Sequence, residues 1–180
     1  MRLITLEHSR ATYIADFAFY ITAVLFLTIY ILSQNLYNLA LVIIMFILIG
    51  IIGWTAIEYL FHRFILHGIQ PFQSWHTEHH KRPRALICLP TALSAALIGT
   101  FIFLPALLVW DELRACALTL GVLVGYLAYT AIHHATHHWR RGSIWLDKRK
   151  HWHIMHHHVK QNGFYGVTSS FWDFVFNSNH

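Results

Sequence analysis

Four long apolar runs dominate this chain of 180 residues and restrict the folds it can adopt. They extend over about residues 13–32, 39–57, 85–110 and 115–132, and the only charged residue among them is Asp16. An α-helix needs about 20 mostly apolar residues to cross the hydrocarbon core of a bilayer. The runs therefore predict an all-α integral membrane protein built on a four-helix transmembrane bundle.

The composition agrees with a membrane location. Hydrophobic residues make up 56% of the chain and charged residues 12%, about half of the roughly 25% that is usual for soluble domains. The length favours a single domain over residues 1–180. The first run is longer than the roughly 7–15 residues of a signal-peptide core, so we expect it to remain as a span. Pro90 and Pro105 are expected to bend the third span.

The distribution of basic residues predicts the orientation of the spans. Of 13 Lys and Arg residues, all but Arg114 lie before the first run, between the second and third runs, or after the fourth. With four crossings these three regions share one side of the membrane, and the positive-inside rule makes that side cytoplasmic. Orientation thus accounts for the basic balance of the chain, and we expect no nucleic-acid partner.

Histidines form a second pattern, because 14 of the 16 fall between His62 and His158. They form four groups, which are HxxxxH at 62–67, HxxHH at 76–80, HHATHH at 133–138 and a fourth group over 151–158 that contains HxxHH at 153–157. Two predicted crossings separate the second group from the third, so the chain returns to the face it left. The four groups are therefore expected to form a helical, histidine-rich cap on the cytoplasmic face.

The spacing within the groups suits a metal site. Neutral imidazole binds iron, zinc, copper and nickel, and helical residues three or four positions apart share a face. Such pairs are His76 with His79, His133 with His137, and His153 with His156. His134 and His138 are also four apart, so spacing alone does not decide which pair of the third group binds metal.

Two further features concern the geometry and the number of metal ions. His62 and His67 are five residues apart, about 140° around an ideal helix, and are expected to straddle a site rather than point the same way. Adjacent histidines such as His79 and His80 point in different directions, which favours two metal ions. Structural zinc sites usually include cysteine, whereas both cysteines here lie in apolar runs and predict no disulfide.

With these motifs the chain resembles the fatty acid hydroxylase superfamily, the integral-membrane group that includes fatty acid 2-hydroxylases and sterol desaturases. The resemblance runs from about Glu58 to Asn177, and residues 1–57 match only as membrane spans. It rests on EYLFHRFILH from Glu58, both HxxHH motifs, GYLAY before the third group and GFYGVTSSFWDFVF from Gly163. Beta-carotene hydroxylases have similar histidine motifs, but this ending favours the fatty acid hydroxylases.

The resemblance implies ten metal ligands. They are His62, His67, His76, His79, His80, His133, His137, His153, His156 and His157. Four histidines are left over without an assigned role, namely His134, His138, His151 and His158.

Other residues are expected to support these ligands or the spans. Glu58, Glu78 and Asp173 are candidates for orienting imidazole N–H groups from behind the metal. Ser169 or Ser170 is expected to cap a short helix over 171–176. The GxxxG at 121–125 predicts close packing between spans of the same chain.

The resemblance also implies the chemistry. It implies two iron ions, and zinc is expected as a substitute in purified protein because such sites bind zinc more tightly. The implied enzyme is an oxidoreductase that uses O2 to hydroxylate or desaturate a C–H bond of a membrane lipid, such as a fatty acyl chain, a sphingolipid or a sterol. A carotenoid hydroxylase and a non-catalytic membrane zinc-binding protein are the alternatives.

Electrons are expected from a separate protein, cytochrome b5-like or ferredoxin-like, because the sequence lacks the b5 domain fused to many eukaryotic 2-hydroxylases. That difference and the small size favour a bacterial inner membrane over the endoplasmic reticulum. The lipid, the carbon attacked and the oligomeric state are not determined by the sequence.

Overall fold

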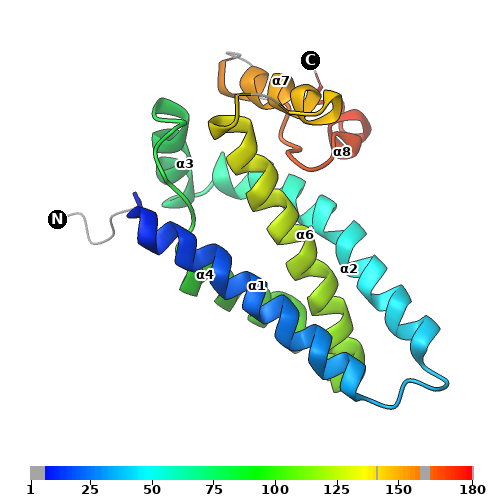
Figure 1. Cartoon of the computed structure of the whole chain (residues 1–180). Helices are drawn as coiled ribbons and strands as arrows, with labels where there is room; N and C mark the ends of the chain where they lie inside the picture. Colours follow the sequence, from blue (N-terminus) through cyan, green and yellow to red (C-terminus); the bar gives the residue numbers. More distant parts are fainter. Residues whose placement is uncertain (1–6, 141, 159–162, 180) are drawn as a thin grey trace. The chain divides into compact units, whose positions relative to one another are not determined.

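The regular secondary structure of the protein is helical, as the sequence predicts. The computed structural model describes residues 7–140, 142–158 and 163–179. Its elements are α1 (Arg10–Ser33), α2 (Ala40–Leu60), η1 (Phe61–Leu66), α3 (Phe72–Lys81), α4 (Thr91–Ile98), η2 (Gly99–Phe103), α5 (Leu104–Val109), α6 (Glu112–His138), α7 (Ile144–His158) and α8 (Phe171–Val175) (Figure 1). The segments η1 and η2 are π-helical, with wider turns than an α-helix.

Four helical segments are long and apolar enough to cross a membrane, which confirms the number of predicted spans. They cover Arg10–Ser33, Ala40–Leu66, Thr91–Val109 and Glu112–His138. Large apolar side chains such as Phe26, Leu41 and Leu108 remain exposed along them, as expected for residues that face lipid. Two spans continue beyond their apolar runs, so the second helix carries His62 and the fourth carries His133 and His137.

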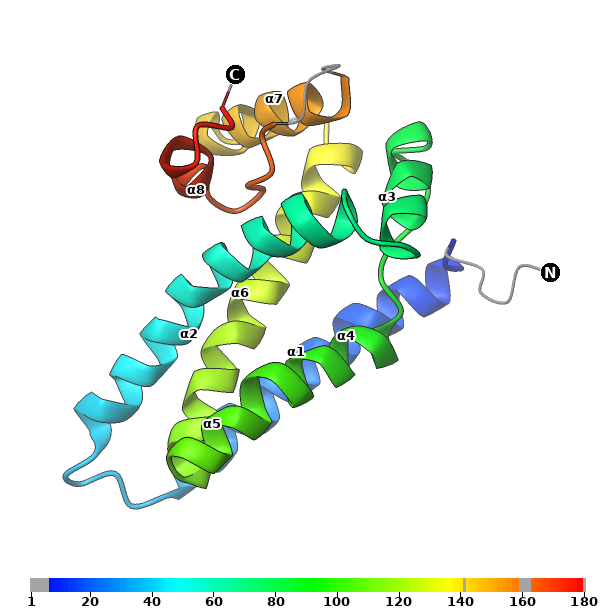
Figure 2. The same cartoon turned by 180° about the vertical axis from the view of Figure 1, so that it is seen from behind.

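The two prolines of the third span act differently. Pro90 precedes α4, so the helix begins at Thr91 and residues 85–90 lie outside it. Pro105 lies within the continuous segment formed by α4, η2 and α5 (Figure 2). A proline ring clashes with the carbonyl group four residues earlier in a regular α-helix. The π-helical turn at Gly99–Phe103 directly precedes Pro105 and provides the local adjustment,.

The chain divides into two compact units. The first comprises residues up to Trp54 together with Cys88–Leu127, and the second comprises Thr55–Ile87 together with the chain from Ala128 onward. Each unit is described separately below. The prediction of one domain over residues 1–180 remains a prediction.

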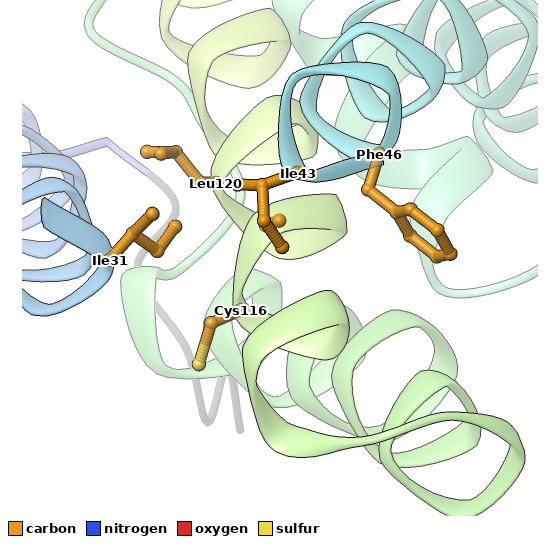
Figure 3. Packing of buried hydrophobic residues seen from close by; sticks show 6 residues of the cluster. Ile31, Ile43, Phe46, Cys116 and Leu120 are labelled. Atoms are coloured by element: carbon orange, nitrogen blue, oxygen red, sulfur yellow. The ribbon is translucent and has the colours of Figure 1, made fainter. Parts of the chain in front are cut away.

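The core of the first unit lies where α1, α2 and α6 meet. Figure 3 shows Ile31 of α1, Ile43 and Phe46 of α2, and Cys116 and Leu120 of α6 in this cluster of buried side chains. Between apolar spans in lipid, close packing takes the place of the exclusion of water as the main source of attraction. The core thus depends on how closely the helices approach one another.

Glycines allow that close approach between α2 and α6. A Cβ atom at Gly121 would overlap the carbonyl oxygen of Ile47, and one at Gly50 would overlap the carbonyl oxygen of Leu118. A Cβ atom at Gly125 would overlap the side chain of Trp54. The GxxxG motif therefore packs against a span of the same chain, as predicted.

The one charged residue of the apolar runs is buried and hydrogen-bonded in the first unit. Asp16 accepts a hydrogen bond of 2.6 Å from the hydroxyl group of Thr91. One helical turn further along α1, the hydroxyl groups of Tyr20 and Ser94 lie 2.6 Å apart. Both contacts join α1 to α4, so Asp16 contributes to packing between spans.

Candidate metal centre

The second unit brings together the histidines of all four sequence groups. His62 lies in η1, which directly continues α2, while α3 carries His76, His79 and His80, α6 carries His133 and His137, and α7 carries His153, His156 and His157. His67 follows η1 as its C-cap residue. All four helical segments contribute these side chains at or near their C-terminal ends.

The π-helical geometry of η1 places His62 and His67 on the same side of the helix. Hydrogen bonds in a π-helix join residues five apart, so such residues lie about one turn from each other. The centroids of the two imidazole rings are 5.3 Å apart. The expectation that this pair straddles a site was therefore wrong, because it assumed an ideal α-helix.

Five imidazoles converge in a first cluster, which comprises His62, His67, His76, His80 and His156. One ring nitrogen of each lies within 4.8 Å of those of all the others. The Nε2 atom of His76 is 2.9 Å from the Nε2 atoms of both His62 and His80. The Nε2 atoms of His67 and His156 are 3.1 Å apart.

Four imidazoles converge in a second cluster, which comprises His79, His133, His137 and His153. Their ring nitrogens also lie within 4.8 Å of one another. The Nε2 atoms of His137 and His153 are 2.7 Å apart. His79 contacts His133 and His137, with centroid distances of 4.8 and 4.9 Å.

His157 contacts both clusters. Its Nε2 atom is 3.2 Å from that of His153 in the second cluster. Its ring stacks on His80 of the first cluster with a centroid distance of 4.2 Å. The structure thus brings all ten histidines of the predicted ligand set into contact within one unit.

The division of histidines between clusters follows their order in the motifs. His80 belongs to the first cluster and the adjacent His79 to the second, as expected for neighbours that point in different directions. On α7, His156 belongs to the first cluster and His153 to the second. Each HxxHH motif therefore supplies both clusters. That each cluster holds a metal ion remains a prediction.

The four remaining histidines of the array lie outside both clusters. His134 and His138 stack on each other with a centroid distance of 4.4 Å. His151 and His158 are exposed. Of the two pairs on α6 that spacing left open, His133 and His137 are the pair that lies in a cluster; that this pair binds metal remains a prediction.

The ring nitrogens of the clusters fit a bound cation. Both ring nitrogens of His79 are buried, as are the Nδ1 atoms of His153 and His157, and none has a hydrogen-bond partner in the described part of the chain. Buried polar atoms without partners cost free energy, and a metal ion bound in the second cluster would supply a partner to a ring nitrogen of His79. A donor set of neutral imidazoles suits iron, zinc, copper and nickel.

Burial keeps these imidazoles in the neutral form that binds metal. Burial alone lowers the pKa of His67 to about 4. Burial, followed by repulsion from neighbouring imidazoles, lowers the pKa of His79 to about 3, of His80 to about 4 and of His157 to about 2. At neutral pH these side chains therefore need not lose a proton before they bind a cation.

The helix ends add an electrostatic contribution. The C-terminal end of a helix carries a partial charge of about −0.5 from its unpaired carbonyl groups. The four contributing segments end at Leu66, Lys81, His138 and His158, close in sequence to the clustered histidines. Because the ligands themselves are neutral, the partial negative charge at these helix ends would favour a cation nearby.

A loop that follows α7 in sequence holds two of the histidines from behind. The Nδ1 atom of His62 donates a hydrogen bond of 2.6 Å to the carbonyl oxygen of Tyr165. The Nδ1 atom of His156 donates one of 2.8 Å to the carbonyl oxygen of Gly163. Each bond places the ring proton on Nδ1 and leaves Nε2 free to bind metal.

Two of the three acidic candidates hold this loop. Glu58 accepts hydrogen bonds from the backbone N–H groups of Val167 and Thr168, at 2.6 and 2.9 Å, and from the hydroxyl group of Thr168. Asp173 accepts bonds of 2.9 Å from the N–H groups of Tyr165 and Gly166. Both acids are buried.

The third acidic candidate lies on the surface. Glu78 is half-buried and forms an ion pair of 2.8 Å with Arg82, the C-cap residue of α3. The short C-terminal helix α8 is capped at its first residue by Ser169, whose hydroxyl oxygen accepts a bond of 3.2 Å from the N–H group of Phe171. Ser170, at the N-cap position, makes no such capping bond.

Sequence reasoning missed the carbonyl groups of Gly163 and Tyr165 as partners of the histidines. Every residue has a backbone carbonyl group, so no residue type marks the ones that accept such a bond. The one signal was Gly166 in the segment GFYG, because glycine lets other groups approach the backbone closely,.

Comparison with known proteins relates this arrangement to one family. The family model described as fatty acid hydroxylase matches residues 47–178. A dihydroceramide fatty acyl 2-hydroxylase of Arabidopsis thaliana is 35% identical over 138 residues, which cover 71% of this chain and 57% of the relative. A fatty acid 2-hydroxylase of Macaca fascicularis is 31% identical, over 73% of this chain and 38% of the relative.

A third relative and one solved structure agree with this. A ceramide very long chain fatty acid hydroxylase of Schizosaccharomyces pombe is 30% identical, over 75% of this chain and 42% of the relative. The visible hydroxylase domain of full-length scs7p superimposes with a TM-score of 0.81 at 24% identity, over 96% of this chain and 67% of that one. This likeness shows a shared fold. The chain spans about 38–57% of the length of these three curated relatives, and as all three are eukaryotic they do not support a bacterial inner membrane.

Proposed function

Because the chain belongs to the fatty acid hydroxylase family, we propose that it is a membrane oxygenase that hydroxylates the acyl chain of a lipid. Carbon 2 of a fatty acyl chain, free or within a ceramide-type lipid, is the proposed position. The names of the relatives support this choice, since they specify 2-hydroxylation of fatty acids or of dihydroceramide acyl chains. The ten clustered histidines supply the chemical support.

The proposed cofactor is a pair of iron ions. The first cluster would hold one ion and the second cluster the other, with His157 between them. Iron, when bound, supplies the activation of O2 that an unreactive C–H bond requires. Zinc binds such ligand sets more tightly than iron(II) does, so purified protein is expected to take up zinc when zinc is present.

The proposed reaction balances as a mono-oxygenation. One atom of O2 enters the C–H bond to give C–OH, and the other leaves as water, with two electrons and two protons consumed. We propose that a separate donor protein, cytochrome b5-like or ferredoxin-like, supplies the electrons. It would approach from the cytoplasmic side, which the distribution of basic residues assigns to the histidine groups.

The residues of the chain perform the positioning. Burial keeps the imidazoles of His67, His79 and His80 neutral and available. The carbonyl groups of Gly163 and Tyr165 orient two further rings. The helices that carry His62 and His133 are both apolar enough to span the membrane, so a lipid substrate would reach the clusters from the bilayer.

One observation carries this proposal: histidines from four separate helical segments converge into two adjacent clusters, and both ring nitrogens of His79 are buried with no hydrogen-bond partner among the residues described. The test is expression of the full chain in a yeast strain without its own acyl 2-hydroxylase, with growth under ¹⁸O2. Mass spectrometry should find 2-hydroxy acyl lipids that carry one ¹⁸O atom. The His137→Ala variant at equal abundance serves as the matched control.

Other outcomes would replace the proposal. Oxidation of supplied carotenoids without acyl products would indicate the carotenoid hydroxylase. Oxidised acyl chains at another carbon, or with a new double bond, would retain the oxygenase and overturn the position or the outcome. Reversible zinc binding with no oxidised lipid from iron-loaded, reduced protein would indicate the non-catalytic metal-binding protein.

A further inference from the structure

The loop that orients His62 is itself held by a buried carboxylate through a single peptide group. The carbonyl oxygen of Tyr165 accepts the hydrogen bond from Nδ1 of His62, at 2.6 Å. The N–H group of Gly166 belongs to the same peptide group and donates to Oδ2 of Asp173, at 2.9 Å. The order of groups is therefore carboxylate, peptide group, imidazole.

We propose that Asp173 is a positioning residue of the first cluster and acts on His62 through the Tyr165–Gly166 peptide group. A carboxylate that accepts from the N–H group polarises the peptide and makes its carbonyl oxygen a stronger acceptor. Partners behind a metal-binding histidine fix its tautomer and ring orientation and raise its basicity. In this chain the carboxylate does so with a peptide group interposed. The inference rests on the proposed function only in taking the clusters as metal sites.

The groups around Asp173 hold its carboxylate against this peptide group. Its side chain is completely buried and accepts two further bonds at Oδ1, from the N–H group of Tyr165 at 2.9 Å and from the hydroxyl group of Ser178 at 2.8 Å. A Cβ atom at position 166 would overlap the carbonyl oxygen of Ser169 and come within 2.8 Å of Oδ2 of Asp173. Glycine at 166 therefore allows the carboxylate to reach the peptide group.

The backbone beside the peptide group is held in an unfavourable conformation. Phe164 has φ of 58°, in the left-handed region, where a bulky side chain is an outlier. Such a conformation persists only when its surroundings determine it, and it occurs often at functional sites. Here it lies between the carbonyl group that holds His156 and the peptide group that holds His62.

Glu58 provides a comparison within the same loop. It accepts from the next two N–H groups, those of Val167 and Thr168. These N–H groups share their peptide groups with the carbonyl groups of Gly166 and Val167. No histidine in the described part of the chain is seen to bond to either carbonyl group. Glu58 therefore anchors the loop without contacting a peptide group that bonds to a clustered histidine. Asp173 anchors the loop and also contacts such a peptide group.

The experiment measures each cluster separately in the purified full chain. In a His137→Ala background the second cluster lacks a ligand, so titration with Co²⁺ alone, followed by its visible absorption, reports the first cluster. In a His80→Ala background the titration reports the second. Asp173→Asn keeps the size of the side chain and removes its charge, and it is introduced into both backgrounds.

Asp173→Asn is expected to weaken Co²⁺ binding at the first cluster by about 10–100-fold, the usual effect of removing a partner behind a metal-binding histidine. The absorption spectrum of that cluster should change as well, because the geometry at His62 changes. Binding at the second cluster should stay the same within error. Ser178→Ala removes a hydrogen bond from the same carboxylate without breaking the contact with the peptide group, and should leave the first cluster unchanged.

Three results would overturn the proposal. The first is unchanged Co²⁺ binding at the first cluster in Asp173→Asn, and the second is an equal loss of binding at both clusters. The third is a loss of binding in Glu58→Gln equal to that in Asp173→Asn, which would show that Asp173 only anchors the loop. If Asp173→Asn does not fold, Asp173→Glu, which keeps the charge but shifts the carboxylate relative to the peptide group, replaces it with the same expected selectivity. Because Co²⁺ binding is measured without lipid or O2, failure here is distinct from failure of the proposed lipid hydroxylation.

Discussion

His79 and His80 are neighbours in the chain, yet their rings enter different clusters. On a helix, consecutive residues point about 100° apart, so one short segment can supply ligands to two ions that lie side by side. His153 and His156 on α7 also divide between the clusters, although they are three residues apart and were expected to share a face,. Each of the two HxxHH motifs therefore carries histidines of both clusters. Loss of one histidine should weaken metal binding first in the cluster to which it belongs.

The His137→Ala variant tests this at the level of one side chain. It should lose the ion of the second cluster, reduce bound metal from about two ions per chain to about one, and lower lipid turnover more than about 100-fold. His134→Ala is the matched control, because His134 lies on the same helix and stacks on His138 outside both clusters. Elemental analysis and product formation measure the two effects. Equal losses of bound metal and turnover in both variants would contradict the assignment of His133 and His137, rather than His134 and His138, as the ligands on α6.

Part of this residue-level pattern follows from the sequence. The doublets favoured two metal ions, and the histidines form two clusters, although the ions themselves remain a prediction. Spacing paired His76 with His79 and His153 with His156, but each of these pairs divides between the clusters. It could not separate His133 and His137 from the pair one residue later, since both pairs obey the same periodicity. It was wrong for His62 and His67, because a π-helical turn leaves no residue-type signature that a spacing rule can use.

At the scale of elements, α2 and α6 bring their backbones together in the first unit. Gly50 and Gly121 face each other closely, and neither position has room for a Cβ atom. Both helices then continue into the second unit, where they carry His62 and His133. Glycines within the spans thus set the contact between the two helices that later present ligands.

Gly121→Ala should destabilise the protein by about 1–3 kcal/mol, the usual cost of overpacking a close contact. In a chain of this size each kcal/mol corresponds to a change of about 2–4 °C in Tm. Gly53→Ala on the same helix as Gly50 meets nothing within 4 Å and should instead stabilise its helix by about 0.5–1 kcal/mol. Thermal unfolding in detergent measures both variants, and similar Tm values for the two would show that the close contact is unimportant.

The elements were predictable to differing degrees. Length and hydropathy identified all four spans, because the hydrocarbon core demands a fixed number of apolar residues. The third began later than expected because Pro90 precedes its first turn. The loop after Gly163 was beyond such reasoning, since its contacts with Glu58 and His62 join residues more than 100 positions apart.

At the scale of the whole molecule, we expect the stability of the second unit to depend on metal, because its histidines form two clusters. Four helical segments contribute rings whose nitrogens converge, and several buried nitrogens have no partner in the described residues. The first unit contains no such histidine cluster among the residues described. A bound ion should therefore protect one part of the chain far more than the other.

Removal of metal tests this dependence. At a free metal concentration 100-fold above Kd, binding contributes about 2.7 kcal/mol for each site. Chelation should speed hydrogen exchange of backbone amides in residues 55–87 and 128–158 and leave residues 10–33 unchanged. Exchange measured by mass spectrometry, with zinc returned as the control, checks the pattern. A uniform increase along the chain would show that metal supports the fold as a whole.

The orientation in the membrane is a second prediction at this scale. Tyr37 is 90% exposed in the connection between the first two spans, and Lys148 is exposed on α7. In a chain with both native cysteines replaced, Tyr37→Cys should react with an impermeant maleimide on intact cells. Lys148→Cys should react only after permeabilisation. The opposite pattern would invert the orientation, and labelling of both on intact cells would reject four crossings.

The hydrogen bond from His62 to Tyr165 joins residues 103 positions apart in the chain. During synthesis the histidine leaves the ribosome long before its acceptor does, and by then two spans have yet to be made. The first cluster therefore cannot be completed until the chain has been made as far as Tyr165, after all four spans. If the clusters hold metal as proposed, the chain should acquire the ion of the first cluster only after its spans have been synthesised.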